Sequence, residues 1–255
     1  MNFIGIIPAR YASSRFPGKP LALICGKPMI QWVYEQSRKE LERVVVATDD
    51  ERIFDCVTRF GGEAVMTSSN HTTGTERIAE AVKLLPGCYD VVINIQGDEP
   101  FIQPEQINAL KQCFTHQDVD IATLIRPFPP TTNYEQLSQP NTPKVTVNQQ
   151  GRALLFSRSV IPFLRDKAKD SWAQYNIYYA HIGIYAYRTN VLQEITKLGR
   201  TPLEIAESLE QLRWLENGYT IQTAITYSVS HGIDTPDDLA DANSHFDEWF
   251  HQKMM

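Results

Sequence analysis

The sequence predicts an α/β fold in which a mostly parallel sheet is covered by helices on both faces. Two observations carry this prediction. Short apolar runs typical of buried strands alternate with segments of helical spacing along most of the chain. Turn and capping residues separate many of these segments. Repeated alternation of strand and helix is the pattern of a parallel sheet with helical crossovers.

The first half of the chain supplies five expected strands, whose apolar runs lie at residues 3–7, 43–48, 64–66, 91–95 and 120–124. Helical spacing or capping residues predict helices between them, at residues 28–40, 50–60, 74–85 and 104–116. Asp49 and Asp50 are suited to cap the second of these helices, and Gly61-Gly62 to stop it.

Residues 126–179 follow a different pattern, because several prolines interrupt helix formation and two short apolar runs flank a polar turn. Lys144–Val147 and Ala153–Phe156 on either side of Asn148-Gln149-Gln150-Gly151 predict a β-hairpin. We interpret 126–179 as an insertion within a single domain over residues 1–255. Its aromatic content favours a role in symmetric self-association, or in covering the substrate side.

The last third returns to alternation. Strands are expected at His181–Tyr187 and Tyr219–Tyr227. The capping pattern Thr201-Pro202-Leu203-Glu204 predicts one helix that runs to about Glu216, and Thr235-Pro236 starts the terminal helix.

Composition restricts the class of protein. A chain of 255 residues with 42% hydrophobic and 21% charged residues is typical of an ordinary globular protein. Its net charge of −6 argues against a general role on nucleic acid or membrane surfaces, which are polyanionic. The four cysteines form no C-x-x-C pair, and the first apolar run ends at Ile7, too short for a signal peptide or membrane span. A cytoplasmic enzyme with reduced thiols is therefore expected.

The loop after the first strand is the most informative segment. Arg10, Arg15 and Lys19 follow residues 3–7, and no acidic residue occurs before Glu35. Arginine and lysine side chains neutralise and orient the charges of a nucleoside triphosphate. A solvated cationic loop is the alternative, but ligands of parallel α/β sheets bind beyond the carboxyl ends of the strands. The common glycine fingerprints are absent, since Pro20 follows Gly18-Lys19 and no G-x-G-x-x-G follows the first strand.

Two aspartates stand where strands end. Asp98, in Gln96-Gly97-Asp98-Glu99-Pro100, follows one strand, and Asp234 follows another before a helix start. Two carboxylates at one sheet edge suit Mg²⁺. An acidic turn at Asp98 and helix capping by Asp234 are the simpler alternatives.

The segment H-T-T-G-T-E-R at 71–77 opens a helix with hydroxyl groups and backbone donors, and Arg77 is suited to a base edge or a phosphate. N-capping explains its threonines equally well.

Seven motifs occur in one order along the chain: I-P-A-R-Y-A-S-S-R-F-P-G-K-P-L, H-T-T-G-T-E-R, N-I-Q-G-D-E-P, F-S-R-S-V-I-P, H-I-G-I-Y-A-Y-R, L-E-Q-L-R and G-I-D-T-P-D-D-L. This order resembles the 3-deoxy-manno-octulosonate (Kdo) cytidylyltransferases, over nearly the whole chain. The resemblance implies a Rossmann-like fold of the nucleotide-diphospho-sugar transferase type and a homodimer. It also implies CMP transfer from CTP to Kdo for lipopolysaccharide biosynthesis, with Mg²⁺ as cofactor.

The resemblance also implies residue roles. CTP would be held by Arg10, Ser13, Lys19, Thr75, Arg77 and Gln96. Mg²⁺ would be held by Asp98 and Asp234, and the catalytic residues would be Arg10, Lys19 and Asp98. Kdo would be held by Arg158, His181, Tyr185, Glu210 and Gln211.

The proposed sugar ligands suit a molecule with one carboxylate and many hydroxyls, with His181 as a carboxylate binder in preference to a base. Each also has a structural explanation: His181 and Tyr185 as core residues on one strand face, and Glu210 with Gln211 as a solvated helical pair. Two departures from the family pattern, Glu76 in place of the common Asp and the segment before Gly232, remove no proposed ligand.

Three other functions are open to this sequence. A cytidylyltransferase for another acidic sugar differs only in its sugar-binding residues. A nucleotide-sugar-binding protein without catalysis has no need of Asp98, Asp234 and Lys19 together. A dinucleotide-dependent oxidoreductase is disfavoured by the missing glycine fingerprint.

Overall fold

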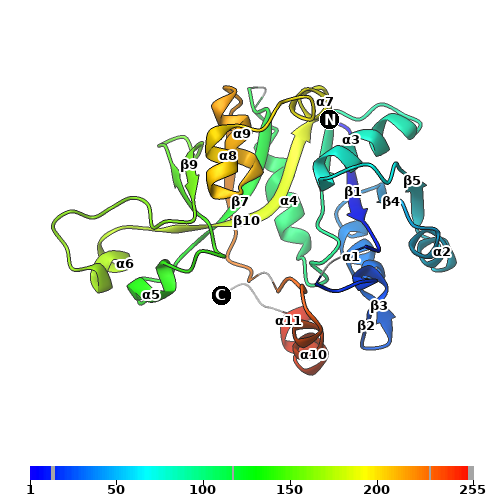
Figure 1. Ribbon diagram of the computed structural model, residues 1–255, viewed down its shortest axis with the longest axis horizontal. Coiled ribbons are helices and arrows are strands. Elements are labelled where there is room, and N and C mark those ends of the chain that lie inside the picture. Colours follow the sequence, from blue (N-terminus) through cyan, green and yellow to red (C-terminus); the bar gives the residue numbers. More distant parts are fainter. Residues whose placement is uncertain (13–14, 117, 230, 252–255) are drawn as a thin grey trace. The chain divides into compact units, whose positions relative to one another are not determined.

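A computed structural model describes residues 1–12, 15–116, 118–229 and 231–251 (Figure 1). The chain forms two compact units. The first comprises Met1–Asn108, Ile184–Thr196 and Ser228–Met255, and the second comprises Ala109–Gly183 and Lys197–Tyr227. The expected insertion 126–179 lies inside the second unit, and the assignment of one domain to 1–255 stays a prediction.

The first unit is built on a parallel sheet. Strand β1 lies between β4 and β6, and β5 pairs with the outer side of β4, all in parallel. The bounds are β1 Phe3–Ala9, β4 Val44–Thr48, β5 Glu63–Met66 and β6 Val91–Asn94. The end of β10 (Tyr179–Arg188) adds an antiparallel strand beside β6. The expected mostly parallel sheet is confirmed.

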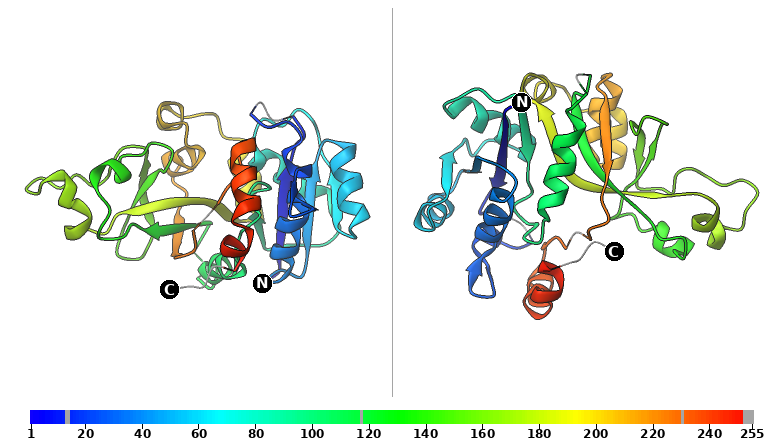
Figure 2. Two further views of the ribbon diagram at one scale, coloured as in Figure 1. Left: turned by 90° about the horizontal axis from the view of Figure 1, so that it is seen from below. Right: turned by 180° about the vertical axis from the view of Figure 1, so that it is seen from behind.

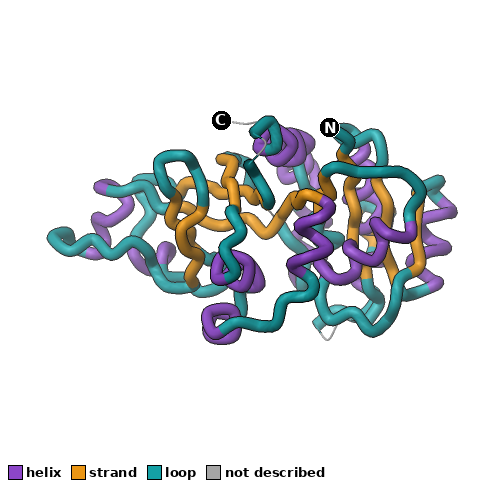
Figure 3. Tube along the Cα trace, turned by 90° about the horizontal axis from the view of Figure 1, so that it is seen from above, coloured by secondary structure: helices purple, strands orange, loops and turns teal. Residues whose placement is uncertain are grey.

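Helices cover both faces of this sheet, because connections between parallel strands of one sheet are right-handed. The chain moves one way across the sheet from β1 through β4 to β5 and then returns to β6, so right-handed connections put α1 and α2 on one face and α3 on the other. Figure 3 shows the strands with helices around them. The bounds are α1 Met29–Arg38, α2 Glu51–Arg59, α3 Gly74–Leu84 and α7 Thr189–Ile195.

The C-terminal helices pack on the early part of the same unit. Helix α10 (Pro236–Ser244) begins after Thr235, whose hydroxyl accepts from the Asp238 backbone N–H at 3.2 Å. The predicted helix start is confirmed, and the cap is Thr235 in place of Asp234, for which capping was the simpler alternative. Asn243 ties this helix to the turn between β2 (Leu23–Ile24) and β3 (Lys27–Pro28), because its side-chain oxygen accepts from the Cys25 N–H at 2.8 Å. Helix α11 (Phe246–Phe250) follows (Figures 1 and 2).

The second unit contains both parallel and antiparallel strand pairings. Strand β7 (Ile121–Pro127) is parallel to β11 (Ile221–Ile225). The predicted hairpin is confirmed, since β8 (Lys144–Val147) pairs antiparallel with β9 (Ala153–Ser157), and β8 also pairs with the start of β10. Short helices α5 (Tyr134–Leu137) and α6 (Trp172–Tyr175) lie within the insertion. Helix α4 (Pro104–Cys113) has residues in both units, because the division falls between Asn108 and Ala109.

The single helix expected from Thr201 to Glu216 is wrong. The structure has α8 (Pro202–Glu207) and α9 (Glu210–Glu216), separated where Ser208 adopts φ 51°. Arg158 stabilises this break, because its Nε donates to the Glu207 carbonyl at 2.6 Å and its Nη2 to the Ser208 carbonyl at 3.3 Å. A helix end leaves carbonyls unpaired, and a distant arginine supplies the donors here.

Candidate active site

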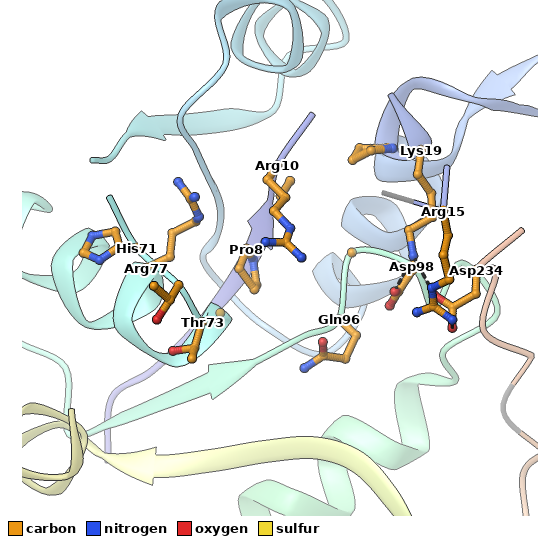
Figure 4. Close-up of a pocket in the computed structure, with 15 residues that line it drawn as sticks. Pro8, Arg10, Arg15, Lys19, His71, Thr73, Arg77, Gln96, Asp98 and Asp234 are labelled. Carbon is orange, nitrogen blue, oxygen red and sulfur yellow. Dashed lines mark hydrogen bonds and ion pairs between the residues drawn. The ribbon is translucent and has the colours of Figure 1, made fainter. Parts of the chain in front are cut away.

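A cavity of about 260 Å³ lies in the first unit, at the carboxyl ends of β1 and β6 (Figure 4). Four cationic side chains and two carboxylates line it, together with His71 and small or polar residues. The lining consists of Pro8, Ala9, Arg10, Arg15, Lys19, Pro20, His71, Thr72, Thr73, Gly74, Arg77, Gln96, Gly97, Asp98 and Asp234. This excess of positive charge suits a polyphosphate.

Neighbouring parallel strands bring the two predicted loops together. Arg10 follows β1, and Gln96 and Asp98 follow β6, which pairs directly with β1 from Phe3↔Val91 to Ile6↔Asn94. Because both strands end at the same edge of the sheet, their loops face one cavity. Arg10, Gln96 and Asp98 were predicted to follow strands, and the structure brings them to one site.

Lys19 lies between the two predicted metal ligands. Its Nζ donates to Asp98 Oδ2 at 2.7 Å and to Asp234 Oδ1 at 3.0 Å. Gly18 sets up this position, since it has φ 72° and a Cβ there would lie 3.0 Å from the Tyr11 ring. The two aspartates are 136 positions apart in sequence, yet their oxygens contact one nitrogen.

The donor set of Asp98 and Asp234 fits Mg²⁺. Both side chains offer hard carboxylate oxygens close enough to share one cation, and Arg15 Nη1 contacts the second oxygen of Asp234 at 3.1 Å. Within the described ranges, no group of three or more His, Cys, Asp or Glu residues could hold a metal ion. Mg²⁺ is commonly bound by one or two carboxylates together with water and substrate phosphates, so a pair is sufficient.

Arg77 lines the cavity but is tied to the protein. Its guanidinium donates to Asp49 Oδ2 at 2.9 Å and to Thr67 Oγ1 at 2.7 Å, and the residue is only 4% exposed. This ion pair joins α3 to the end of β4. The structure therefore gives Arg77 a role in holding the cavity wall.

Two glutamates on α3 hold the loop that precedes it. The Glu76 carboxylate accepts from the Thr72 N–H at 2.8 Å, while the Thr73 hydroxyl caps the helix, so the capping explanation is confirmed for Thr73. One turn later, Glu80 accepts from the Ser68 N–H at 2.8 Å and contacts His71 Nε2 at 2.5 Å. These hydrogen bonds lower the pKa values of both glutamates and keep them anionic.

Two predicted nucleotide ligands are not placed at the cavity. Thr75, in the first turn of α3, is 3% exposed and is absent from the cavity lining given above. Ser13 lies outside the described residues. Both assignments stay predictions.

The predicted sugar ligands Arg158, His181, Glu210 and Gln211 lie in the second unit, whereas Tyr185 lies in the first. The Arg158 guanidinium donates hydrogen bonds to three backbone carbonyls, those of Glu207, Ser208 and Pro140, the last at 2.8 Å. Its structural role at the end of α8 is therefore established by contacts, and its binding of a sugar carboxylate stays a prediction.

His181 is a neutral imidazole at neutral pH. Burial lowers its pKa from 6.5 to about 3. Thr123 donates its hydroxyl hydrogen to the Ile182 carbonyl at 3.2 Å, so Thr123 Oγ1 is the acceptor for His181 Nε2 at 3.1 Å. This pattern assigns the ring proton to Nε2 and makes Nδ1 a hydrogen-bond acceptor.

The low pKa of His181 predicts acid sensitivity. Between pH 6.5 and about 3 the unfolded chain binds a proton at His181 that the folded chain does not, so the free energy of unfolding falls as pH falls through this range. Urea unfolding at pH 7.5 and pH 5 measures this change. The free energy of unfolding is expected to fall less between these two pH values in His181→Gln than in the parent protein. His116→Gln, at an exposed position of the same unit, is the control. An unchanged pH dependence in His181→Gln would contradict the prediction.

The remaining sugar candidates are packed side chains. Tyr185 is 7% exposed in β10 and stacks on Tyr187 with ring centroids 5.9 Å apart. Gln211 is 5% exposed, and its buried Nε2 has no hydrogen-bond partner among the described residues. Glu210 contacts Arg213. A buried amide without a partner is costly, so Gln211 is the candidate whose geometry most favours a ligand.

Comparisons with known proteins show the family to which this chain belongs. A family model described as cytidylyltransferase matches residues 4–221. The chain is 57% identical over 244 residues to the 3-deoxy-manno-octulosonate cytidylyltransferase of Phocaeicola vulgatus, covering 96% of this chain and 97% of that relative. It is 56% identical over 243 residues to the enzyme of the same name from Parabacteroides distasonis, covering 95% and 97%. The chain belongs to the 3-deoxy-manno-octulosonate cytidylyltransferase family.

A solved structure supports the same family. CMP:2-keto-3-deoxy-manno-octonic acid synthetase complexed with CTP matches with a TM-score of 0.89 and 40% identity, over 97% of this chain and 99% of that chain. Membership of the 3-deoxy-manno-octulosonate cytidylyltransferase family confirms the resemblance and the nucleotidyltransferase class. The cytidylyltransferase model ends at residue 221, so Asp234 lies beyond the matched segment.

Sequence reasoning missed one charged residue beside the cavity of this family member. Glu99 is partly buried next to Asp98, and burial with the charges of Asp98 and Asp234 raises its pKa to about 8. Its position directly after Asp98 was visible in the sequence, but its environment depends on the loop at Gly232, which is distant in sequence.

Proposed function

We propose that this chain transfers CMP from CTP to the anomeric hydroxyl of Kdo, giving CMP-Kdo and pyrophosphate. The observation that carries the proposal is the cavity in which Lys19 contacts both Asp98 and Asp234 beside Arg10 and Arg15. Family membership supplies the substrates, and the cavity supplies charges of the kind that a nucleoside triphosphate with a divalent cation requires.

CTP is held at this cavity by cationic and polar side chains. Arg10 and Lys19 orient and neutralise its phosphates, and Gln96, which also lines the cavity, hydrogen-bonds the nucleotide. Arg77 lines the cavity and holds its wall through Asp49 and Thr67. Ser13 and Thr75 complete the proposed nucleotide set.

Mg²⁺ is held by Asp98 and Asp234. The ion supplies Lewis-acid stabilisation of charge on the phosphate oxygens. Arg10 and Lys19 neutralise the charge that develops as the sugar hydroxyl displaces pyrophosphate in line from the α-phosphorus, and they fix the phosphates for that attack. Lys19 donates to one oxygen of each aspartate. When Lys19 contacts the phosphates instead, these oxygens become available to bind the cation.

Kdo is held by Arg158, His181, Tyr185, Glu210 and Gln211. The tautomer assigned to His181 suits acceptance of a hydrogen bond from a sugar hydroxyl, so the sugar carboxylate is better matched to Arg158 than to His181. Gln211 offers its buried amide N–H to an oxygen of the sugar.

The second unit also suggests a homodimer. Large apolar side chains are exposed over the insertion: Leu154 by 61%, Phe163 by 69%, Tyr175 by 60% and Ile177 by 62%. Large exposed apolar side chains are candidates for an association surface, and a symmetric pair is the commonest arrangement. Light scattering is expected to give twice the monomer mass, with Phe163→Glu shifting it toward the monomer. A monomer at micromolar concentration would contradict this.

We place the reaction in the cytoplasm. All four cysteines are free, as expected in a reducing compartment. None of the described helices is long and apolar enough to cross a membrane.

Pyrophosphate release tests the proposed function. Each of the four ribonucleoside triphosphates is incubated with a panel of acidic sugars, with and without Mg²⁺. Release with CTP and Kdo alone, and only with Mg²⁺, is the expected result. Release with CTP and a sialic acid or an amino analogue of Kdo would favour a cytidylyltransferase for that sugar, and no release with any pair would favour a binding protein.

A further inference from the structure

The loops that carry Asp98 and Asp234 are in direct contact. The backbone N–H of Ile233 donates to the Asp98 carbonyl at 2.9 Å. At Gly232, a Cβ would lie 3.2 Å from Glu99 Oε1, so a larger residue would require the Glu99 side chain to shift by a few tenths of an ångström. The separation of the two carboxylates therefore depends on how these loops are held.

One aromatic side chain from the C-terminal helix contacts both loops. The Trp249 ring stacks on His231, three residues before Asp234, with centroids 4.0 Å apart and planes at 8°. It meets Phe101, three residues after Asp98, edge-on at 5.4 Å and 88°. Phe101 and Ile233 are 2% and 1% exposed and belong to the same apolar cluster as Trp249.

The same helix is anchored elsewhere by different residues. Phe246 and Phe250 pack on Trp32 of α1, with ring centroids 4.7 Å and 5.0 Å apart. Helix α11 thus rests on α1 through two phenylalanines, and Phe246 also meets Phe101 with ring centroids 5.8 Å apart. Trp249 contacts both metal-binding loops. Phe250 contacts Trp32, whereas Trp249 contacts Phe101 and His231, so these two residues separate the attachment of the helix from its effect on the loops.

We propose that Trp249 is a positioning residue for the metal site, which fixes the spacing of Asp98 and Asp234 by packing against His231 and Phe101. The proposal rests on the assignment of these aspartates to the cation. It goes beyond the segment matched by the cytidylyltransferase model, which ends at residue 221. Residues outside the ligand shell that orient metal ligands commonly change metal affinity by about 10- to 100-fold when altered.

Mn²⁺ binding to the nucleotide-free enzyme, followed by the electron paramagnetic resonance of free Mn²⁺, tests the proposal. Trp249→Ala is expected to raise the Kd for Mn²⁺ by about 10-fold. It is expected to raise the Mg²⁺ concentration needed for half-maximal turnover in parallel, with kcat at saturating Mg²⁺ much less affected. Trp249→Phe keeps an aromatic contact and is expected to fall between Trp249→Ala and the parent protein.

Phe250→Ala is the matched control, because it removes an aromatic side chain from the same helix at the contact with Trp32. A Kd within about twofold of the parent value, well below the change expected for Trp249→Ala, supports the proposal. An equal loss in both variants, or an unchanged Kd in Trp249→Ala, would overturn it. If Trp249→Ala does not fold, Trp249→Phe compared with Phe250→Leu decides by the same criteria. Asp98→Asn separates a failure of the Trp249 proposal from a failure of the metal assignment. Unchanged Mn²⁺ binding in Asp98→Asn would reject the assignment of Asp98 to the metal.

Discussion

Asp98→Asn lowers kcat by about 10³-fold or more in our account, because a metal-binding carboxylate provides several kcal/mol of stabilisation to the charge of the transition state. An asparagine oxygen keeps the size of the side chain but not its charge. CTP binding is largely retained, since Arg10 and Lys19 remain in the cavity. Pyrophosphate release under saturating CTP, Kdo and Mg²⁺ measures kcat, and calorimetry in the absence of Kdo measures CTP binding.

Asp237→Asn is the control for this variant. Asp237 lies three residues from Asp234 in the first turn of α10 and is exposed. The substitution therefore removes a nearby charge without altering the cavity. Its kcat is expected to stay close to that of the parent protein. Near-normal kcat of Asp98→Asn at saturating Mg²⁺ would defeat the assignment of Asp98.

Lys19→Met is expected to lower kcat/KM for CTP by about 10- to 100-fold, because a hydrogen bond to a charged group contributes about 1.5–3 kcal/mol. The same change removes the cation that contacts both Asp98 and Asp234 at 2.7 and 3.0 Å. The nucleotide-free variant is therefore expected to bind Mn²⁺ more tightly than the parent protein. Opposite effects on CTP use and on metal binding separate this prediction from simple unfolding.

Lys27→Met provides the comparison for Lys19→Met. Lys27 pairs with Glu35 at 2.6 Å and does not line the cavity. Neither CTP use nor Mn²⁺ binding is expected to change in it. Weaker Mn²⁺ binding in Lys19→Met would show that the lysine does not compete with the metal for the two carboxylates.

Most strands and helices of the first unit could be predicted from the sequence. Apolar runs and caps are local features, so β1, β4, β6 and the start of α10 were predicted to within a few residues. The parallel order followed from the same alternation. The break between α8 and α9 was missed because Arg158, which pairs with the carbonyls at Glu207 and Ser208, is about fifty positions away.

The candidate site was predicted unevenly for a similar reason. Residues in loops that follow expected strands, such as Arg10, Asp98 and Asp234, were predicted by local pattern, and they line one cavity. Arg77 also lines the cavity, but its bond to Asp49 depends on how α3 packs beside β4. The contacts of Trp249 with Phe101 and His231 require the tertiary fold, and no motif in the sequence indicates them.

The central claim is that Asp98 and Asp234 hold one cation against the phosphates of CTP. A crystal structure of the protein grown with CTP and Mn²⁺, with anomalous data collected at the manganese edge, tests it most directly. The account predicts an anomalous peak that contacts both carboxylates and phosphate oxygens, with Lys19 turned toward the triphosphate. A peak away from either aspartate, with Lys19 still bridging Asp98 and Asp234, would contradict it.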